Sequence, residues 1–528
     1  MYRYGVECIS LPFDNDTLHR LVLEGVYLIA GYGTDTLFES VAEMLQAGGA
    51  QTHIIRMDSG RNDAVAHVGA PNQEHSGMKA FSNLKQKLNG EPVRGIIYLL
   101  PRVSSSEMSL HSGYYTQSLF QLLQTFHDEL NRKDDHLSHV IAVTSLGGDF
   151  GLSGQVAPIG DSAGCLGLMK SVAREWPSVR CMALDMDPVI AEQDVVGRIK
   201  DEMEHDSDRA VEIGFDQFGN RITTGLVELP LLDDRPVAAS LAEGSVIVAT
   251  GGAYGITAEC LKALSPLHRP HLILLGRSPL PVAEDPEYAA FSEPAQLRKY
   301  LLQSAMQAGQ RPKPIEIERK VRNILKERQI RNTIAYMQEH AASVDYFSVD
   351  VRQREALSEV LTHIYNRYGQ IDAVIHGAGV IEDKLLKEKP PEAFDRVFGT
   401  KVDSALALAE LLKPEKLKCL VFFSSVAGRF GNVGQSDYSA ANEVLNKLAD
   451  HLNRNWPGRV VSINWGPWDS GMVSPKLKEL YAERGIELIP MNKGVERFVQ
   501  ELSDRADASA EVVVTCSAEQ IASGLGRA

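Results

Sequence analysis

The stretch VIVATGGAYGIT at residues 246–257 joins a short apolar strand, a glycine-rich turn and the start of a helix. Gly251 and Gly252 allow the backbone to turn tightly against a pyrophosphate, and Gly255 allows helix and strand to approach closely. The unpaired N–H groups at the start of such a helix bind phosphate oxygens. The segment therefore predicts a dinucleotide-binding unit.

Apolar strands of the same kind recur along the chain and alternate with segments of helical periodicity. They lie at 25–33, 95–100, 139–145, 245–252, 271–278, 372–379, 419–425 and 460–467. Continuous apolar strands are typical of parallel sheets that helices cover on both faces. The predicted fold class is α/β, with Rossmann-like, doubly wound parallel sheets.

An internal repeat appears when the chain is shifted by 280 residues. The segment VIAVTSLGGDFGLSG (140–154) then overlies LVFFSSVAGRFGNVG (420–434), and REWP (174–177) overlies RNWP (454–457) without a gap. Two related Rossmann-like halves explain this pattern.

The repeat also predicts which half carries a reaction. The shift places Pro158 opposite Tyr438 and Ser162 opposite Asn442. Because proline has no ionisable proton, we expect the N-terminal half to be a degenerate, structural copy. We place the boundary in the polar stretch LLDDRPVAASLAEG (231–244), which gives a structural subdomain at 1–235 and a catalytic one at 236–528.

Composition narrows the class of protein. The 528 residues carry a net charge of −15, which argues against nucleic acid and anionic membranes as partners. The six cysteines are scattered, without the spacing of a zinc site, and no run of about 18 apolar residues occurs. We expect a cytoplasmic enzyme with no bound metal.

The strand after the glycine turn ends in Arg277 and Ser278, where an enzyme for the unphosphorylated cofactor would carry an acidic residue. A guanidinium at this place can pair with a 2′-phosphate, which favours NADPH, although a solvated surface arginine is the alternative. Two further strand ends fit cofactor contacts, with Asp350 and Val351 toward the adenine and Gly377 and Gly379 under the ribose.

A possible proton donor lies in FFSSVAGRFGNVGQSDYSAANEVLNK (422–447). Reduction of a ketone builds negative charge on oxygen, so the reaction needs a donor and a nearby cation that keeps the donor acidic. Tyr438 follows Ser425 by 13 residues and suits the donor. Its neighbour one helical turn on is Asn442, so the cation must come from elsewhere.

These segments, with GRS at 276–278 and FGTKVDSALALAELL at 398–412, resemble the ketoreductase domains of type I polyketide and fatty-acid synthases. Those domains form a branch of the short-chain dehydrogenase/reductase superfamily. The resemblance implies that the lysine comes from the preceding helix, as Lys401, while Asn442 takes the usual lysine place. It thus implies a catalytic tetrad of Lys401, Ser425, Tyr438 and Asn442.

The segments 463–490 and 313–342 most resemble the ketoreductases of polyunsaturated-fatty-acid and enediyne-type synthases. The resemblance implies a helical insert at about 285–342 and a lid over the substrate at about 469–490. It also implies a set of cofactor contacts: Gly251, Gly252, Tyr254, Gly255, Ile256, Arg277, Ser278, Asp350, Val351, Gly377, Ala378, Gly379, Lys401, Tyr438 and Pro467.

The implied reaction is the NADPH-dependent reduction of a β-ketoacyl thioester on acyl carrier protein, beside neighbouring ketosynthase and dehydratase domains of a megasynthase. The tripeptide IED at 381–383 resembles the Leu-Asp-Asp of B-type ketoreductases and implies a D-configured β-hydroxyl, whereas Asp383 could instead cap a helix. Asp383, Gln435 and Met472 are the implied substrate and stereocontrol residues.

Two other functions remain open at this point. A reductase-like scaffold without catalysis would carry the same fold, and a stand-alone 3-oxoacyl reductase would carry the same chemistry. GDSA at 160–163 resembles the phosphopantetheine site of a carrier domain, but the small residues Ala163 and Gly164 follow the serine inside a repeat unit. We interpret it as part of the structural half.

Overall fold

The computed structural model describes residues 1–13, 21–33, 36–57, 76–102, 115–134, 136–158, 160–205, 210–230, 241–309, 311–469, 475–502 and 509–517. Within these ranges it is an α/β protein built on one 15-stranded sheet, which confirms the predicted fold class. The predicted boundary between residues 235 and 236 lies outside the described residues.

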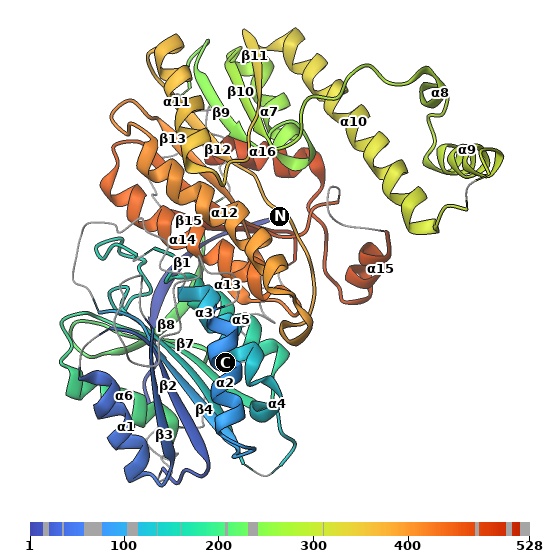
Figure 1. Cartoon of the computed structure of the whole chain (residues 1–528). Coiled ribbons are helices and arrows are strands. Elements are labelled where there is room, and N and C mark those ends of the chain that lie inside the picture. Colours follow the sequence, from blue (N-terminus) through green and yellow to red (C-terminus); the bar gives the residue numbers. More distant parts are fainter. Residues whose placement is uncertain are drawn as a thin grey trace.

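The first half of the chain alternates strands and helices (Figure 1, lower part). Its elements are β1 (Tyr2–Ser10), β2 (Val26–Tyr32), α1 (Leu37–Ala47), β3 (Gln51–Met57), α2 (Ser76–Lys87), β4 (Val93–Leu99), α3 (Tyr115–Thr125), α4 (His127–Leu130), β5 (Ser138–Thr144), α5 (Gly164–Glu175), β6 (Val179–Met186), α6 (Glu192–Glu204), β7 (Glu212–Phe215) and β8 (Arg221–Glu228).

The second half repeats this alternation with additional helices (Figure 1, upper part). Its elements are β9 (Val246–Thr250), α7 (Gly255–His268), β10 (His271–Gly276), α8 (Pro286–Ala289), α9 (Pro294–Gln307), α10 (Pro314–His340), β11 (Ser343–Ser348), α11 (Arg354–Tyr368), β12 (Ala373–His376), η1 (Leu386–Glu388), α12 (Pro391–Leu411), β13 (Cys419–Ser425), α13 (Val426–Phe430), α14 (Ser436–Asn455), β14 (Arg459–Trp465), α15 (Pro475–Glu483), α16 (Met491–Glu501) and β15 (Glu511–Thr515).

Strand order shows how the halves are related. The sheet runs β11-β10-β9-β12-β13-β14-β15-β1-β8-β7-β6-β5-β4-β2-β3. The order β10-β9-β12-β13-β14-β15 in the second half corresponds to β3-β2-β4-β5-β6-β7 in the first, and each of these neighbouring pairs is parallel. Strand β1 pairs antiparallel with both β15 and β8 and thereby joins the halves into one sheet, which the repeat did not predict.

The largest apolar core is shared by both halves. Helices α3 and α5 of the first half and α11, α12 and α14 of the second contribute to the same cluster of buried side chains. The rings of Phe120 on α3 and Phe394 on α12 stack with their centroids 4.4 Å apart. Helices α1 and α6 cover the other face of the first half, and α7 and α16 that of the second.

Helices α5 and α14 approach most closely at a glycine. A Cβ atom added to Gly167 would lie 2.4 Å from the backbone oxygen of Ser439. The absence of a side chain at Gly167 therefore lets the largely buried helix α14 pack backbone to backbone on the first half.

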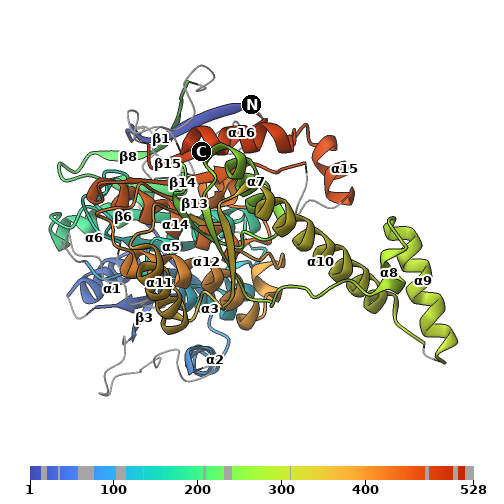
Figure 2. The same ribbon diagram turned by 90° about the horizontal axis from the view of Figure 1, so that it is seen from above.

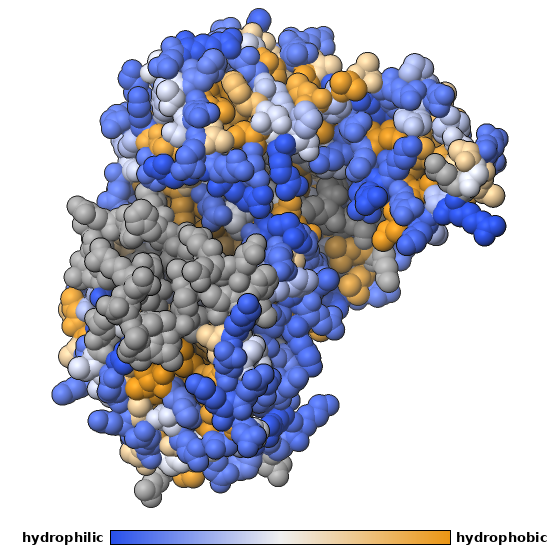
Figure 3. Space-filling model, viewed as in Figure 1, coloured by the Kyte–Doolittle hydropathy of each residue, from blue (hydrophilic) through white to orange (hydrophobic). Residues whose placement is uncertain are grey.

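The insert helices α8, α9 and α10 leave the body of the molecule as an arm (Figure 2). The arm has a small core of its own, formed by Leu297, Leu301, Ile317, Val321 and Ile324. Figure 3 shows orange, apolar side chains gathered on it, and Met306 and Ile315 are among the exposed apolar residues there.

A cluster of buried charges also connects the halves. Arg429 on α13 forms ion pairs with Glu212 on β7, Glu443 on α14 and Glu511 on β15. Burial alone would lower the pKa of Arg429, but the surrounding carboxylates outweigh it and raise this pKa. Lys170 on α5 bonds to Glu212 at 2.9 Å and to Glu443 at 3.2 Å.

We expect Arg429→Met to lower the free energy of unfolding by about 3–5 kcal/mol, because removing one member of a buried ion cluster leaves uncompensated charge. Urea denaturation measures this loss. The matched control is Arg298→Met, which breaks the exposed pair with Glu318 on the arm and should leave the urea midpoint nearly unchanged. Equal midpoints for both variants would contradict the prediction.

Candidate active site

The glycine turn between β9 and α7 has an open phosphate cradle. Gly251 and Gly255 both have φ +70°, a conformation that glycine adopts without strain. A Cβ atom at Gly255 would meet no atom within 4 Å, so the turn faces open space there. The close approach of helix and strand predicted at Gly255 is therefore not found at this residue. The turn fits the pyrophosphate of a dinucleotide, because the first N–H groups of α7 lie beside it.

Thr257 occupies the third glycine position of the cofactor turn. Gly377, just after β12, leaves the space that the threonine side chain fills. A Cβ atom on Gly377 would lie 2.1 Å from Oγ1 of Thr257, which is itself buried. The close approach of helix and strand therefore depends on Gly377 as well as on the turn.

Apart from Lys401 and Tyr438, which lie on helices, the other predicted cofactor residues lie at the carboxyl ends of β10, β11, β12 and β14, on one edge of the sheet. Arg277 and Ser278 are exposed just after β10. The Asp350 carboxylate pairs with Arg352 at 2.6 Å, and this hydrogen bond lowers its pKa. Val351 is only 7% exposed and belongs to the main apolar core.

One cation near the turn was not predicted. Nζ of Lys326, on α10 of the arm, lies 5.6 Å from the ring centre of Tyr254, the N-cap residue of α7. The contact joins residues that are far apart in the sequence, so no local pattern could have predicted it.

The four tetrad residues come from three elements. Ser425 ends β13 and is the N-cap of α13, where its Oγ accepts a hydrogen bond from the N–H of Ala427. Tyr438 and Asn442 lie one turn apart on α14, and Lys401 lies on α12. The structure brings all four together.

Lys401 is the only tetrad residue from α12, and its side chain is buried. Its Nζ donates a 2.6 Å hydrogen bond to the backbone oxygen of Phe423 and lies 5.6 Å from the ring centre of Tyr438. A Cβ atom on Gly379 would lie 3.0 Å from its Cε, so the glycine leaves room for the lysine. Burial lowers the pKa of Lys401 to about 7.

The Tyr438 hydroxyl is held in its protonated form. Burial raises its pKa to about 12, while hydrogen bonds with Asn442 and Ser425 act in the opposite direction. A phenol with this pKa is a proton donor that still needs a positive charge nearby to release its proton readily. Lys401 is placed to provide that charge.

Asn442 is fully buried and has one unused acceptor. Its Nδ2 donates to the backbone oxygen of Tyr438 at 2.7 Å, whereas its Oδ1 has no hydrogen-bond partner. Because an unsatisfied buried acceptor costs free energy, this oxygen is suited to accept a hydrogen bond from a water molecule.

Two of the three predicted stereocontrol residues are in contact. Nε2 of Gln435, the N-cap residue of α14, donates to Oδ1 of Asp383 at 3.1 Å. Burial raises the pKa of Asp383, and its charge acts on Tyr481 of α15, in the predicted lid. Met472 lies outside the described residues.

Sequence reasoning missed two buried groups that support the tetrad. His376 ends β12 and lies within hydrogen-bonding distance of Thr250 Oγ1 (2.8 Å) and the backbone oxygen of Lys401 (3.1 Å). Burial and the Lys401 charge lower its pKa to about 3, so it is neutral. Lys389 forms a buried 2.8 Å ion pair with Asp437, the residue before Tyr438. The sequence gives no local signal for either pairing.

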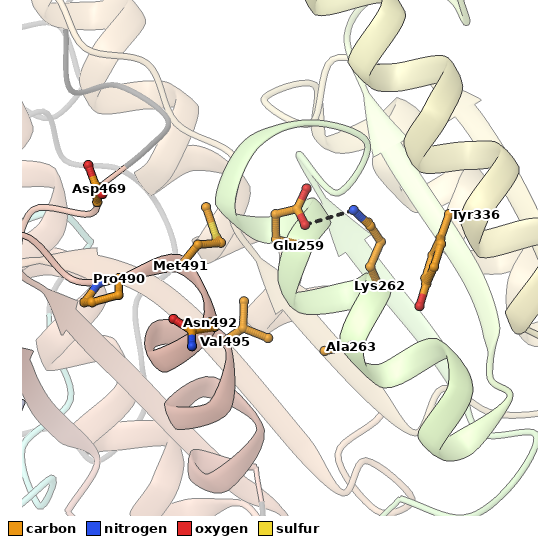
Figure 4. Close-up of a pocket in the computed structure, with 9 residues that line it drawn as sticks. All are labelled: Glu259, Lys262, Ala263, Tyr336, Asp469, Pro490, Met491, Asn492 and Val495. Atoms are coloured by element: carbon orange, nitrogen blue, oxygen red, sulfur yellow. Dashed lines mark hydrogen bonds and ion pairs between the residues drawn. The ribbon is translucent and has the colours of Figure 1, made fainter. Parts of the chain in front are cut away.

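A separate pocket of about 730 Å³ lies on the outer side of α7, against α10 and α16 (Figure 4). Its lining includes Tyr336, Met491 and Val495 and the 2.9 Å Lys262–Glu259 pair, but none of the predicted site residues. This pocket is distinct from the tetrad.

Two other types of site are absent from the described ranges. These ranges contain no helix with the length and apolarity needed to cross a bilayer. They also contain no group of three or more His, Cys, Asp or Glu side chains placed to hold a metal ion.

The whole chain is similar in fold to solved ketoreductases. An N-terminal ketoreductase from the macrolactin assembly line matches with a TM-score of 0.69 at 17% identity, covering 99% of this chain and 93% of that one. A ketoreductase domain from the bacillaene assembly line matches with a TM-score of 0.64 at 21% identity, covering 98% and 97%. At these identities the likeness establishes the fold.

Sequence comparison matches part of the chain to a known family. Residues 244–470 match the family described as KR domain. Over 340 residues the chain is 33% identical to a polyunsaturated fatty acid synthase polypeptide of Thraustochytrium sp., covering 62% of this chain and 12% of that protein. It is 26% identical over 315 residues to polyketide synthase PksN of Bacillus subtilis, covering 58% and 5%.

The fold is thus the one seen in solved ketoreductases. Residues 244–470 match the ketoreductase (KR) domain family, and the similar proteins are polyketide and polyunsaturated fatty acid synthases, in agreement with the resemblance seen in the sequence. The chain spans only 12% and 5% of the two relatives' lengths.

We expect Gly377→Ala to lower the free energy of unfolding by about 1–3 kcal/mol, because the new methyl group overlaps Thr257. Thr257→Gly in the same chain should recover part of this loss by removing the overlapping side chain. Thermal unfolding of the two single variants and the double variant measures the coupling. Additive effects would contradict the proposed compensation.

Proposed function

We propose that this chain is an NADPH-dependent reductase of β-ketoacyl thioesters carried on acyl carrier protein, acting during polyketide or polyunsaturated fatty acid elongation. The observation that carries the proposal is the convergence of Lys401, Ser425, Tyr438 and Asn442 beside an open glycine turn. The ketoreductase family supports the same chemistry.

The tetrad residues have distinct roles in this proposal. Tyr438 donates its phenolic proton to the carbonyl oxygen as negative charge develops there, and the Ser425 hydroxyl donates a hydrogen bond to the same oxygen. The Lys401 ammonium favours the phenolate left on Tyr438, because an opposite charge nearby lowers a pKa. Asn442 fixes the turn of α14 that carries Tyr438.

NADPH, when bound, supplies the hydride for the substrate carbon. Gly251, Gly252, Tyr254, Gly255 and Ile256 would hold its pyrophosphate at the start of α7. The remaining proposed contacts are Arg277, Ser278, Asp350, Val351, Gly377, Ala378, Gly379 and Pro467, which follow strands at the same edge of the sheet, and Lys401 and Tyr438, which lie on α12 and α14.

We further propose that the product carries a D-configured β-hydroxyl. The contact between Asp383 and Gln435 places a polar pair beside Tyr438, whose pKa the Asp383 charge raises. Such a pair can select which face of the ketone meets the cofactor. A non-catalytic scaffold is the second candidate, but the buried, mutually contacting tetrad favours an enzyme.

We also propose that the chain divides into two subdomains and that a lid covers the substrate. Residues 1–235 serve as the structural subdomain and 236–528 as the catalytic one, with the arm as its insert. Helix α15 within 469–490 covers the substrate, since Tyr481 on it is close enough for the Asp383 charge to raise its pKa. Neighbouring ketosynthase and dehydratase domains would deliver and receive the carrier in the cytoplasm.

Tyr438→Phe should lower kcat by at least about 100-fold, because a general acid contributes about 10²–10⁴-fold. The assay follows NADPH oxidation with a short β-ketoacyl thioester, and chiral chromatography of the product tests the D configuration. Tyr300→Phe is the matched control, since it removes a hydroxyl that bonds to Glu287 on the arm and leaves the tetrad intact. No turnover by the parent protein would favour the scaffold, and an L product would refute the stereochemical proposal.

Arg277→Asp should raise KM for NADPH far more than KM for NADH, because it replaces the cation proposed for the 2′-phosphate with a negative charge. Arg269→Asp is the matched control: Arg269 is also exposed and flanks β10, but at the strand's opposite end. The ratio of the two KM values should change only in the first variant. An unchanged ratio in Arg277→Asp would remove Arg277 from the cofactor site.

A further inference from the structure

A carboxylate from the first half contacts two loops of the second. Glu175 is the last residue of α5, and its Oε1 accepts a 2.9 Å hydrogen bond from the N–H of Gly434. Its Oε2 accepts another, also 2.9 Å, from the N–H of Leu386. One side chain therefore bridges residues that are 48 positions apart in the chain.

Each of the two bridged loops carries one of the residues proposed to control which face of the ketone is reduced. Gln435 directly follows Gly434, and Tyr438 lies about one turn later on α14. Asp383 lies three residues before Leu386. The loops also bond to one another, since the N–H of Lys384 donates to the Gly434 oxygen at 3.0 Å and Gln435 donates to Asp383.

The same end of α5 holds the loop before Gly434 by further bonds. Nε of Arg174 donates to the backbone oxygen of Phe430 at 2.7 Å, and Oγ of Ser171 accepts from the N–H of Asn432 at 3.2 Å. A Cβ atom on Gly431 would lie 2.5 Å from the backbone of Lys170, so the loop runs tightly against α5.

The internal repeat indicates that Glu175 has a task of its own. In the overlay of REWP on RNWP, Glu175 corresponds to Asn455. The Asn455 amide donates within its own helix, to the backbone oxygen of His451 at 2.8 Å. The acid at position 175 is therefore not a requirement of the shared fold, because the corresponding residue makes only a local contact.

We infer that Glu175 is a positioning residue, which fixes the Asp383–Gln435 pair relative to Tyr438 and so sets which face of the ketone is reduced. The inference rests on the reductase function proposed above. Hydrogen bonds from N–H groups to a carboxylate are charge-assisted and stronger than neutral ones. Without Glu175, the loop at 430–434 keeps its bonds to Arg174 and Ser171, whereas the segment of Asp383 and Leu386 loses its bond to α5 and can shift relative to that loop.

The first test uses Glu175→Gln, which keeps the shape of the side chain but has one acceptor oxygen in place of two. We expect amide hydrogen exchange at Gly434 or Leu386 to become at least about tenfold faster, as the loss of one charge-assisted bond implies. We also expect lower kcat and a less enantiomerically pure product, with KM for NADPH unchanged, because Glu175 contacts none of the proposed cofactor residues.

Glu355→Gln is the matched control, since Glu355 is an exposed acid on the outer helix α11 and should change none of these quantities. Glu175→Asp, which retains both acceptor oxygens, should restore part of the enantiomeric purity. It also replaces Glu175→Gln if that variant fails to fold.

Three outcomes are decisive. Unchanged exchange at both amides overturns the bridge. A lower melting temperature with unchanged enantiomeric purity and kcat overturns the positioning role and leaves a purely structural one. If the parent protein shows no turnover, the proposed function fails, and the exchange measurement still decides whether Glu175 holds the two loops.

Discussion

The close packing of α14 on α5 is the constraint on which the site depends. Gly167 brings the two backbones together, and the buried charges around Arg429 fix α13 and α14 against the first half. Helix α14 carries Tyr438 and Asn442, and α13 begins at Ser425. Three of the four tetrad residues are therefore positioned by contacts with a half that contributes no tetrad residue.

The position of Lys401 shows that the positive charge beside Tyr438 can come from a helix other than α14. Lys401 enters from α12, is anchored by the backbone oxygen of Phe423 and lies beside the Tyr438 ring. Asn442 occupies the position one turn after the tyrosine and keeps an unused acceptor. What matters for the phenol is a nearby ammonium, because electrostatic influence depends on distance rather than on sequence position.

In the first half, a carboxylate holds the loop that corresponds to the one after Ser425. Ser145 directly follows β5 and corresponds to Ser425 in the repeat. Beside it, the carboxylate of Asp185 on β6 accepts hydrogen bonds from Thr144 Oγ1 and from the N–H groups of Leu146 and Phe150. These bonds close the loop, and Pro158 stands where the repeat places a tyrosine. The contacts that this half makes with the tetrad region come instead from α5, which bonds to the loop at 430–434.

The sequence by itself determined the α/β class, the repeat and the family, because apolar strands, glycine turns and motif spacing are local patterns. It also placed Ser425 and most cofactor candidates at strand ends that the sheet brings to one edge, and Lys401, Tyr438 and Asn442 on helices. Only the tertiary structure decided that β1 joins both halves in one sheet, that Gly377 accommodates Thr257, and that His376, Lys389 and Glu175 surround the tetrad. These contacts join residues far apart in the chain, and their geometry depends on how whole helices pack, which no local pattern encodes.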